Sequence, residues 1–489
     1  MQITLHVATM GNNNDLLGLH TVVAVNNMKA LNLKLLGLNF IFSTITLVES
    51  NGNYSSWYYK NWCGGTLQYL DDSLCAKIFP DLDVDTYSNF ICEASIMDQE
   101  PPSTSGFQLN GPLKDIEIDI NSLDSVVADE DVNLCVILTR RVSKSESSSG
   151  ELIYNKYLCA SNRSSSDAYE TWSSSKIFAM ANAAGHLRTN ESSESCSGDY
   201  SGLFGLDSSI TGKKGKTMLG DLSTVICSYD HTAGYTSNSL SSYFHDLGWR
   251  DRINYLLRDW LGAAEGQTLG GNYGEATPSD LSFALLSSST SSSPLFSPPS
   301  SSTVMEASQG TCPADKDPWP TVYSNTLSAL AAAEMARRIA QHREMPPTMR
   351  FPGAEWLDMQ AILYGSREQS LFFPGQLWGG MAADTAIFMQ TALQSLTLKD
   401  SEPVLDGSSW RILSKLGAGY STSRLRGEIV TTVYACIPRR LRSDGSSLPG
   451  LELTLSARGS VLHDTSLRTV EKKLLDAVSK AVQYIYDNY

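Results

Sequence analysis

The sequence predicts an α+β fold, in which strands from both ends of a domain share one antiparallel sheet and a helical region is inserted between them. Two apolar runs with the character of buried strands come first, at 132–138 and 152–158. Segments with helical spacing of apolar residues follow. Three strand-like runs then return, at 410–415, 428–437 and 451–455. This order of elements indicates an α+β domain.

The middle of the chain supplies most of the helices. We expect helices at 176–187, 240–261, 327–342, 355–364, 381–393 and 467–486. A serine- and proline-rich tract at about 287–320 has no periodicity and too few apolar residues to fold, so we expect a disordered insertion there. No internal repeat is apparent. The domain is therefore expected to span 112–489.

The first 111 residues differ from the rest of the chain. Residues 28–50 combine two basic residues with an apolar run, which is typical of a secretory leader and too short and polar for a membrane-spanning helix. A leader should not follow 27 other residues. Either translation starts at Met28 or the run is a core strand or helix. Residues 51–111 are expected to form an N-terminal extension that could bind a protein partner.

Composition sets limits on function. The chain has 489 residues, 42% of them hydrophobic, and a net charge of −15. An acidic surface repels phosphate backbones, so nucleic-acid binding is not expected. The histidines form no H-E-x-x-H or H-x-x-x-H pattern and no C-x-x-C pair occurs, so the sequence predicts neither a metal site nor a cofactor.

Cysteines and sequons favour an exported protein. Nine cysteines are present, and disulfides are most plausible among Cys63, Cys75 and Cys92. The odd count leaves one thiol free or paired between chains. Three N-x-S sequons fit a secreted glycoprotein, at Asn53, Asn162 and Asn190.

Three short stretches carry most of the chemical information. Ser173-Ser174-Ser175-Lys176 precedes an apolar helix, Thr236-Ser237-Asn238 precedes another, and Lys415-Leu416-Gly417 ends an apolar strand. Together they resemble the S-x-x-K, S-x-N and K-T-G boxes of serine β-lactamases and penicillin-binding proteins. The resemblance covers roughly 115–489 and implies the same α+β fold, with one active site built from distant segments.

The first two boxes would supply the nucleophile and the proton transfers. Spacing of three residues at a helix start puts Ser173 and Lys176 on one face, where a lysine with a lowered pKa could activate the serine. The resemblance implies that Thr236 or Ser237 relays a proton and that Asn238 binds the substrate and the lysine. The alternative for each box is a helix-capping residue with no role in chemistry.

The third box would complete the site. The resemblance makes Lys415 a second proton-transfer group, lets Gly417 approach the acyl group closely, and makes the amide of Ala418 an oxyanion donor beside that of Ser173. Leu416 replaces the family threonine that contacts a substrate carboxylate, and Arg424 or Arg426 could compensate. A plain hairpin is the alternative. The competing sequence Lys213-Lys214-Gly215 is expected to be a solvated loop.

One expected motif is missing. Class A β-lactamases carry E-x-x-L-N between the second and third boxes, and its glutamate activates the deacylating water. Glu265 and Glu275 are the candidates for this role here, although neither stands in that motif. A base on a mobile loop would be poorly placed, so efficient β-lactam hydrolysis is not expected.

The function predicted from the sequence is a serine acyl-hydrolase that acts on an amide, ester or peptide. Ser173 would form the acyl-enzyme with Lys176 as its base. The stretch Ser-Ser-Ser-Lys-Ile-Phe also resembles serine-dependent glutaminases. The alternative function is a non-catalytic descendant of the fold that serves as a scaffold or binding subunit.

Overall fold

The structure is a computed structural model. It describes residues 96–97, 105–142, 152–191, 204–208, 215–229, 235–248, 250–277, 283–285, 325–365, 379–384, 386–396, 411–437, 440–441, 447–448 and 450–489. All of them belong to the second of two compact units, Pro80–Tyr489. The leader-like segment, Asn53, the cysteines at 63, 75 and 92, and the serine/proline tract lie outside the described residues.

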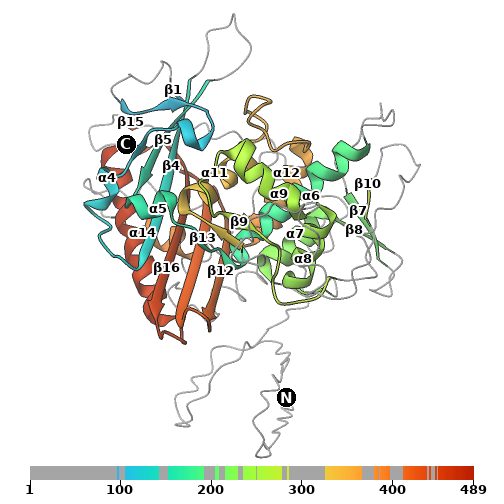
Figure 1. The fold of residues 1–489 in the computed structure, drawn as a ribbon. Helices are drawn as coiled ribbons and strands as arrows, with labels where there is room; N and C mark the ends of the chain where they lie inside the picture. Colours follow the sequence, from blue (N-terminus) through green and yellow to red (C-terminus); the bar gives the residue numbers. More distant parts are fainter. Residues whose placement is uncertain are drawn as a thin grey trace, which may run out of the picture. The chain divides into compact units, whose positions relative to one another are not determined.

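A large sheet forms the framework of this unit (Figure 1). Its main path runs in the order β12-β13-β16-β4-β5-β2, and every pair along the path is antiparallel. The long strands are β4 (Val132–Val142), β5 (Leu152–Cys159), β12 (Arg411–Ser421), β13 (Arg426–Ile437) and β16 (Leu451–Leu462). Strands from the two ends of the unit therefore share one antiparallel sheet, as predicted.

Short strands extend this sheet beyond the predicted N-terminal boundary. β1 (Ile96–Met97) pairs in parallel with β4, and β3 (Ile118–Asp119) pairs in parallel with β5, while β2 (Gln108–Leu109) pairs antiparallel with β5. Because β1 and β2 precede residue 112, the sheet takes up the end of the segment that we expected to be an extension. Smaller sheets are formed by β6 (Tyr169–Glu170), β7 (Phe204–Ser208), β8 (Gly215–Met218), β9 (Thr268–Leu269), β10 (Phe283–Leu285), β11 (Asn325–Leu327), β14 (Arg440–Leu441) and β15 (Ser447–Leu448).

Two helices cover the two faces of the sheet. Alternate residues of β16 point to opposite faces. Gly459 lies against Val470 and Leu474 of α14 (Arg468–Asn488), whereas Glu452 accepts a hydrogen bond from Gln341 at the end of α11 (Ala329–Ala340). The predicted helices at 327–342 and 467–486 are thus confirmed, and the apolar side chains of the sheet are buried between them.

The part of the unit that lies beside the sheet in Figure 1 contains the helices α6 (Lys176–Glu191), α7 (Leu219–Ser228), α8 (Ser237–Leu247), α9 (Arg250–Tyr255) and α12 (Trp356–Tyr364). On the sheet side lie α4 (Asn121–Asp124) and α5 (Asn162–Ser166), and α13 (Ile387–Gln394) packs against α14. The other helical segments are η3 (Leu113–Asp115), η4 (Trp172–Ser175), η5 (Leu256–Leu261) and η6 (Gly380–Ala383). The predicted helix at 240–261 is divided into three, with α8 ending at Gly248. A Cβ atom on Gly248 would lie 2.4 Å from Nδ2 of Asn182 on α6, so the backbone makes its turn in close contact with that helix.

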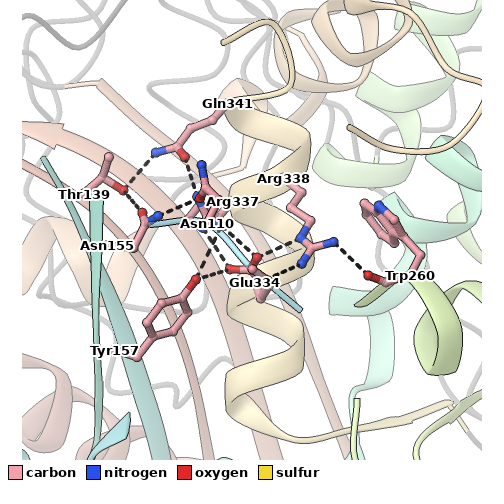
Figure 2. Close-up of polar contacts among 10 residues, drawn as sticks. Asn110, Thr139, Asn155, Tyr157, Trp260, Glu334, Arg337, Arg338 and Gln341 are labelled. Atoms are coloured by element: carbon pink, nitrogen blue, oxygen red, sulfur yellow. Dashed lines mark hydrogen bonds and ion pairs between the residues drawn. The ribbon is translucent and has the colours of Figure 1, made fainter. Parts of the chain in front are cut away.

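A buried polar network holds α11 against the sheet (Figure 2). Arg337 and Arg338 both bond the carboxylate of Glu334, and all three side chains are 0% exposed. Tyr157 of β5 donates to Glu334, and Arg337 reaches Asn110. Each charge in this network has an opposite charge or a fixed dipole as its partner, which is the condition for burying it stably.

One disulfide lies within the sheet. Cys135 of β4 and Cys159 of β5 face each other across the strand pair and are bonded. Cys436 is also disulfide-bonded, while Cys227 is a free, buried thiol. The sequon residue Asn162 is exposed at the start of α5.

Candidate active site

The first box forms a tight turn that leads into a buried helix. Residues 172–175 are the 3-10 helix η4, and Lys176 begins α6. Trp172 has a φ of 49°, in the left-handed region that a bulky side chain seldom adopts. Such strained positions cluster at functional sites. The turn therefore fixes the direction in which the next residue, Ser173, is presented.

The three consecutive serines have different surroundings. Ser174 is buried and donates to the carbonyl of Thr171 at 2.6 Å. Ser175 is also buried and donates to the carbonyl of Trp172 at 3.0 Å. Ser173 is half-buried, and its hydroxyl makes no hydrogen bond with any residue that the structure describes. Ser173 is therefore the serine that a substrate can reach.

The edge strand β12 passes directly against this turn. A Cβ atom on Gly417 would lie 2.5 Å from the backbone nitrogen of Ser173 and 2.9 Å from the carbonyl oxygen of Thr171. Only a glycine permits this approach. The neighbouring Ala418 is exposed. The structure thus brings together the two backbone segments that were predicted to supply the oxyanion donors, Ser173 and Ala418.

The second box contacts the first through Lys176. Its Nζ donates to Oγ of Ser237 at 2.9 Å and to Oδ1 of Asn238 at 2.6 Å, and the lysine is 0% exposed. No hydrogen bond joins Nζ to the hydroxyl of Ser173 in the described part of the chain. Ser173 and Lys176 are three residues apart in a 3-10 turn, where such positions eclipse each other. Positions with this spacing lie on one side of the turn, and hydrogen bonds between reacting groups often tighten only when a substrate is bound.

The hydroxyl in contact with Lys176 is that of Ser237, not that of Thr236. Thr236 caps α8, where its oxygen accepts a hydrogen bond from the amide of Ser239, and its hydroxyl also bonds the carboxylate of Glu275. Ser237 donates to the carbonyl of Ile226 while it accepts from Lys176. Of the two predicted proton carriers, only Ser237 is therefore placed to exchange a proton with the lysine.

The third box places a second buried lysine near the first. Lys415 is 0% exposed, and its Nζ donates to the carbonyl of Leu416 at 2.9 Å. The carboxylate of Asp384 lies 3.9 Å away, and the ring of Tyr229 is centred 4.0 Å from Nζ. The sequence analysis missed both Asp384 and Tyr229, because neither belongs to a motif and both come close only in the folded chain.

The two lysines have opposite electrostatic surroundings. Burial lowers the pKa of Lys176 well below that of an exposed lysine, and the nearby charge of Lys415 lowers it further. Burial would also lower the pKa of Lys415, but Tyr229 and Asp384 more than offset it and raise that pKa. The geometry therefore favours a neutral amine on Lys176 and an ammonium on Lys415, which is the division of roles that a base and an electrostatic stabiliser need.

Glu275 lies at the site, whereas Glu265 does not. Glu275 accepts a hydrogen bond from Nδ2 of Asn238 at 3.1 Å, besides its bond with Thr236. Glu265 is exposed in a turn. Of the two candidate deacylation bases, only Glu275 is therefore close to the boxes.

The segment that carries Glu275 is fixed rather than mobile. Asn325 accepts from the amide of Gly271 at 2.9 Å, Arg250 donates to the carbonyl of Gly270 at 2.8 Å, and Thr277 donates to Asp246 at 2.6 Å. Gly271 has a φ of 76°, and a Cβ atom there would collide with His245. The expectation that a mobile loop would place this acid poorly is thus wrong for residues 262–277.

Buried hydrogen bonds of Tyr273 connect this segment to the turn that carries Ser173. The hydroxyl of Tyr273 lies 3.1 Å from Oγ of Ser175 and 3.2 Å from Nε2 of His245. The Tyr273 ring is centred 5.2 Å from Nζ of Lys176. His245 is buried, which lowers its pKa well below its usual value, so its imidazole stays neutral. Tyr273 and His245 were not identified from the sequence.

The predicted substrate arginines already have partners within the chain. Arg424 forms an ion pair with Glu428 at 2.7 Å. Arg426 donates to Oγ of Ser460 at 3.1 Å and lies 3.6 Å from Asp131. The structure therefore does not place either guanidinium as an available anion-binding group. Of the competing sequence at 213–215, Gly215 begins β8, and the two lysines lie outside the described residues.

Two further features bear on the class of protein. Within the described residues, no group of three histidine, cysteine or acidic side chains could hold a metal ion. No helix in that part of the chain is long and apolar enough to cross a membrane.

Comparisons with known proteins found similar solved structures at low sequence identity. No protein-family model and no curated protein matches the chain. Similar solved structures include a class A β-lactamase from Mycobacterium abscessus, at 10% identity over 75% of this chain and 99% of that chain, with a TM-score of 0.33. PBP-A matches at 8% identity over 78% and 100% of the two chains, with a TM-score of 0.36. The TP domain of Burkholderia pseudomallei penicillin-binding protein 3 matches at 11% identity over 79% and 97%, with a TM-score of 0.35.

At these TM-scores the matches do not carry the assignment of the fold. The order of the elements and the meeting of three distant boxes at one edge of the sheet are seen in the chain itself. They give a β-lactamase-like α+β arrangement, the one implied by the resemblance to serine β-lactamases and penicillin-binding proteins.

Proposed function

We propose that the protein is a serine acyl-hydrolase in which Ser173 forms an acyl-enzyme. The observation that carries the proposal is the placement of Lys176. It is fully buried beside a second lysine, its hydrogen-bond partners are the neutral groups of Ser237 and Asn238, and it follows Ser173 by one turn. Burial and the neighbouring lysine lower the pKa of this amine, so it is neutral more readily than an exposed lysine and can accept a proton from the serine.

The acylation step follows from this arrangement. Oγ of Ser173 attacks the carbonyl carbon of the substrate while its proton moves to Nζ of Lys176. The amides of Ser173 and Ala418 stabilise the oxyanion. The proton then passes through the hydroxyl of Ser237 to the leaving group as the bond to that group breaks. Lys415 stays charged and stabilises the developing negative charge.

Deacylation needs an activated water, and Glu275 is the available base. Its carboxylate is oriented by Thr236 and Asn238, and the segment that carries it is fixed. Water would attack the acyl carbon, give its proton to Glu275, and release the acid as the proton returns to Ser173. A small molecule or peptide with an amide or ester bond fits this chemistry.

The test is covalent labelling with a fluorescent fluorophosphonate. Wild type is expected to be labelled at Ser173, Ser173→Ala is expected to be unlabelled, and Ser166→Ala is the matched control because it removes an exposed serine of α5. Equal labelling of Ser173→Ala would remove Ser173 as the nucleophile.

The second candidate function is a non-catalytic binding subunit. It is favoured by one observation, that Lys176 donates to Ser237 and Asn238 and not to Ser173. Absence of labelling in the wild type would support this alternative.

We also propose that the protein is exported. The disulfide between Cys135 and Cys159, the bonded Cys436 and the exposed sequon at Asn162 support this location, because disulfides persist mainly in oxidising compartments. In that setting, the part of residues 51–111 that does not pair into the sheet as β1 and β2 would be available to bind a protein partner. Mass spectrometry of protein secreted from a eukaryotic host would detect a glycan on Asn162 and a processed N-terminus.

A further inference from the structure

The candidate active site contains several basic side chains, and those that are charged already have carboxylate partners. Lys415 is covered by the ring of Tyr229, and it lies 3.9 Å from the carboxylate of Asp384. Lys176 is fully buried, and the carboxylate of Glu275 is in its electrostatic field. The charge of Lys415 is thus matched by Asp384, the amine of Lys176 is neutral, and both side chains are buried.

The two arginines that follow the third box, Arg424 and Arg426, also have partners within the chain. Glu428 is fully buried, and its carboxylate forms ion pairs with Arg424 at 2.7 Å and with Arg458 of β16. It also accepts a hydrogen bond from the indole nitrogen of Trp172 at 3.0 Å. Releasing Arg424 to a substrate would remove one partner of a buried carboxylate, which is costly. Arg426 is held by Ser460 and Asp131.

The residue after Lys415 has an apolar side chain, and its backbone groups already have hydrogen-bond partners. Leu416 is half-buried and offers no hydroxyl. Its amide donates to Asp384 at 2.9 Å, and its carbonyl accepts from Tyr229 at 2.9 Å and from Lys415. Beyond it, Ala418 is exposed and the Trp172 ring lies against Gly419. The strand edge where a substrate would lie therefore presents mainly apolar surface.

From these contacts we infer that the site takes acyl substrates that carry no carboxylate beside the reacting carbonyl, such as neutral esters or amides. The inference rests on the proposed function. A carboxylate brought to this edge loses its hydration. Among the described residues, no unpaired cation lies there to compensate for that loss, and position 416 offers no hydroxyl. A neutral substrate avoids this cost and gains contact with Leu416 and Ala418.

The test uses two probes that differ in this charge and otherwise only by one methyl group. A fluorescent penicillin and its carboxylate methyl ester contain the same reactive carbonyl. The second-order rate constant for acylation of Ser173 is measured for each, with a fluorophosphonate as the reference. We expect the methyl ester to react at least about tenfold faster than the free acid, within the range of discrimination that a single pocket contact supplies.

Equal rates, or a faster free acid, would overturn the inference while leaving the proposed function intact. Absence of reaction with the fluorophosphonate and with both penicillins would reject the proposed function, and the inference with it.

A matched pair of variants tests the role of Leu416 directly. Leu416→Thr adds a hydroxyl, and Leu416→Val has the same shape without it. We expect the rate for the free acid, relative to the methyl ester, to rise several-fold in Leu416→Thr and to stay unchanged in Leu416→Val. The same change in both variants would show that side-chain volume, not the missing hydroxyl, sets the preference.

Discussion

The buried charged cluster on α11 and the one at the candidate active site are built from similar groups but stabilise opposite states. On α11, Arg337 and Arg338 share the carboxylate of Glu334, with N–O distances of 2.7 Å (Figure 2). At the site, Lys176 has a second lysine nearby and donates its hydrogen bonds to a serine and an asparagine. Both clusters are removed from water.

The consequence is visible in the pKa values. Burial raises the pKa of Glu334, but the two arginines more than offset it and hold that pKa below its usual range. The pKa of Lys176 is lowered by burial and by Lys415. Burial alone therefore does not make a charged residue structural or reactive. The sign and geometry of its partners decide which of its protonation states is stable.

The largest expected effect comes from removing the amine at the site. Lys176→Met should lower the rate of fluorophosphonate labelling by roughly 10²–10⁴-fold, the usual contribution of a positioned base. Its free energy of unfolding should stay the same or increase, because a buried amine beside a like charge is replaced by an apolar side chain of similar length. Labelling kinetics and urea denaturation measure the two effects. A labelling rate within threefold of wild type would exclude Lys176 as the base.

The matching change in the α11 cluster should act on stability instead. Glu334→Ala leaves two buried arginines without their shared carboxylate and should cost about 3–5 kcal/mol of the free energy of unfolding. Glu130→Ala removes an exposed glutamate and should stay within about 0.5 kcal/mol. Urea denaturation of both variants measures the difference. A loss below about 1 kcal/mol for Glu334→Ala would contradict the structural role given to this cluster.

The two clusters should make stability rise with pH in two different pH windows. Glu334 has a lowered folded-state pKa, so its stabilisation is present above its ordinary value of 4.5 and is lost as pH falls through the folded-state pKa. For Lys176, the unfolded chain binds more protons than the folded chain between the lowered pKa and 10.5. Stability should therefore rise with pH across that window.

Urea midpoints of wild type and Lys176→Met, compared from neutral pH to about 10, measure the lysine contribution. The rise is expected in the wild type and should be absent from the variant. Parallel curves for the two proteins would mean that Lys176 is not deprotonated by folding.

The smallest expected effect comes from removing the hydroxyl of Tyr273, which links the segment of Glu275 to the turn that carries Ser173. Tyr273→Phe keeps the ring near Lys176 but removes the hydroxyl that bonds Ser175 and His245. The rate of labelling should fall about three- to tenfold, which corresponds to the loss of the hydrogen bond with Ser175, the one of the two that reaches the turn of Ser173. Tyr484→Phe on α14 is the control. Equal rates for Tyr273→Phe and the control would show that the hydrogen bonds of Tyr273 do not position Ser173.

Much of the sheet could be predicted because a long apolar run is buried whichever elements pack against it. β4, β5, β13 and β16 contain the predicted runs, and α11 and α14 have the expected spacing. The helix expected at 240–261 was wrong in its continuity, since contact of Gly248 with α6 ends α8 there. α7 was not predicted, although all of its residues are buried, because a helix buried on every side lacks the polar face that reveals a period.

The sequence by itself determined the three boxes, and with them Ser173, Lys176, Asn238, Lys415 and Gly417, because their chemistry depends on local spacing. Only the tertiary structure decided that Ser237 and not Thr236 contacts Lys176, that Glu275 and not Glu265 lies at the site, and that Arg424 and Arg426 have partners within the chain. It also brought in Asp384 and Tyr229. The physical reason is that a pKa and a binding preference depend on which groups lie within a few ångströms, and here those groups come from segments far apart along the chain.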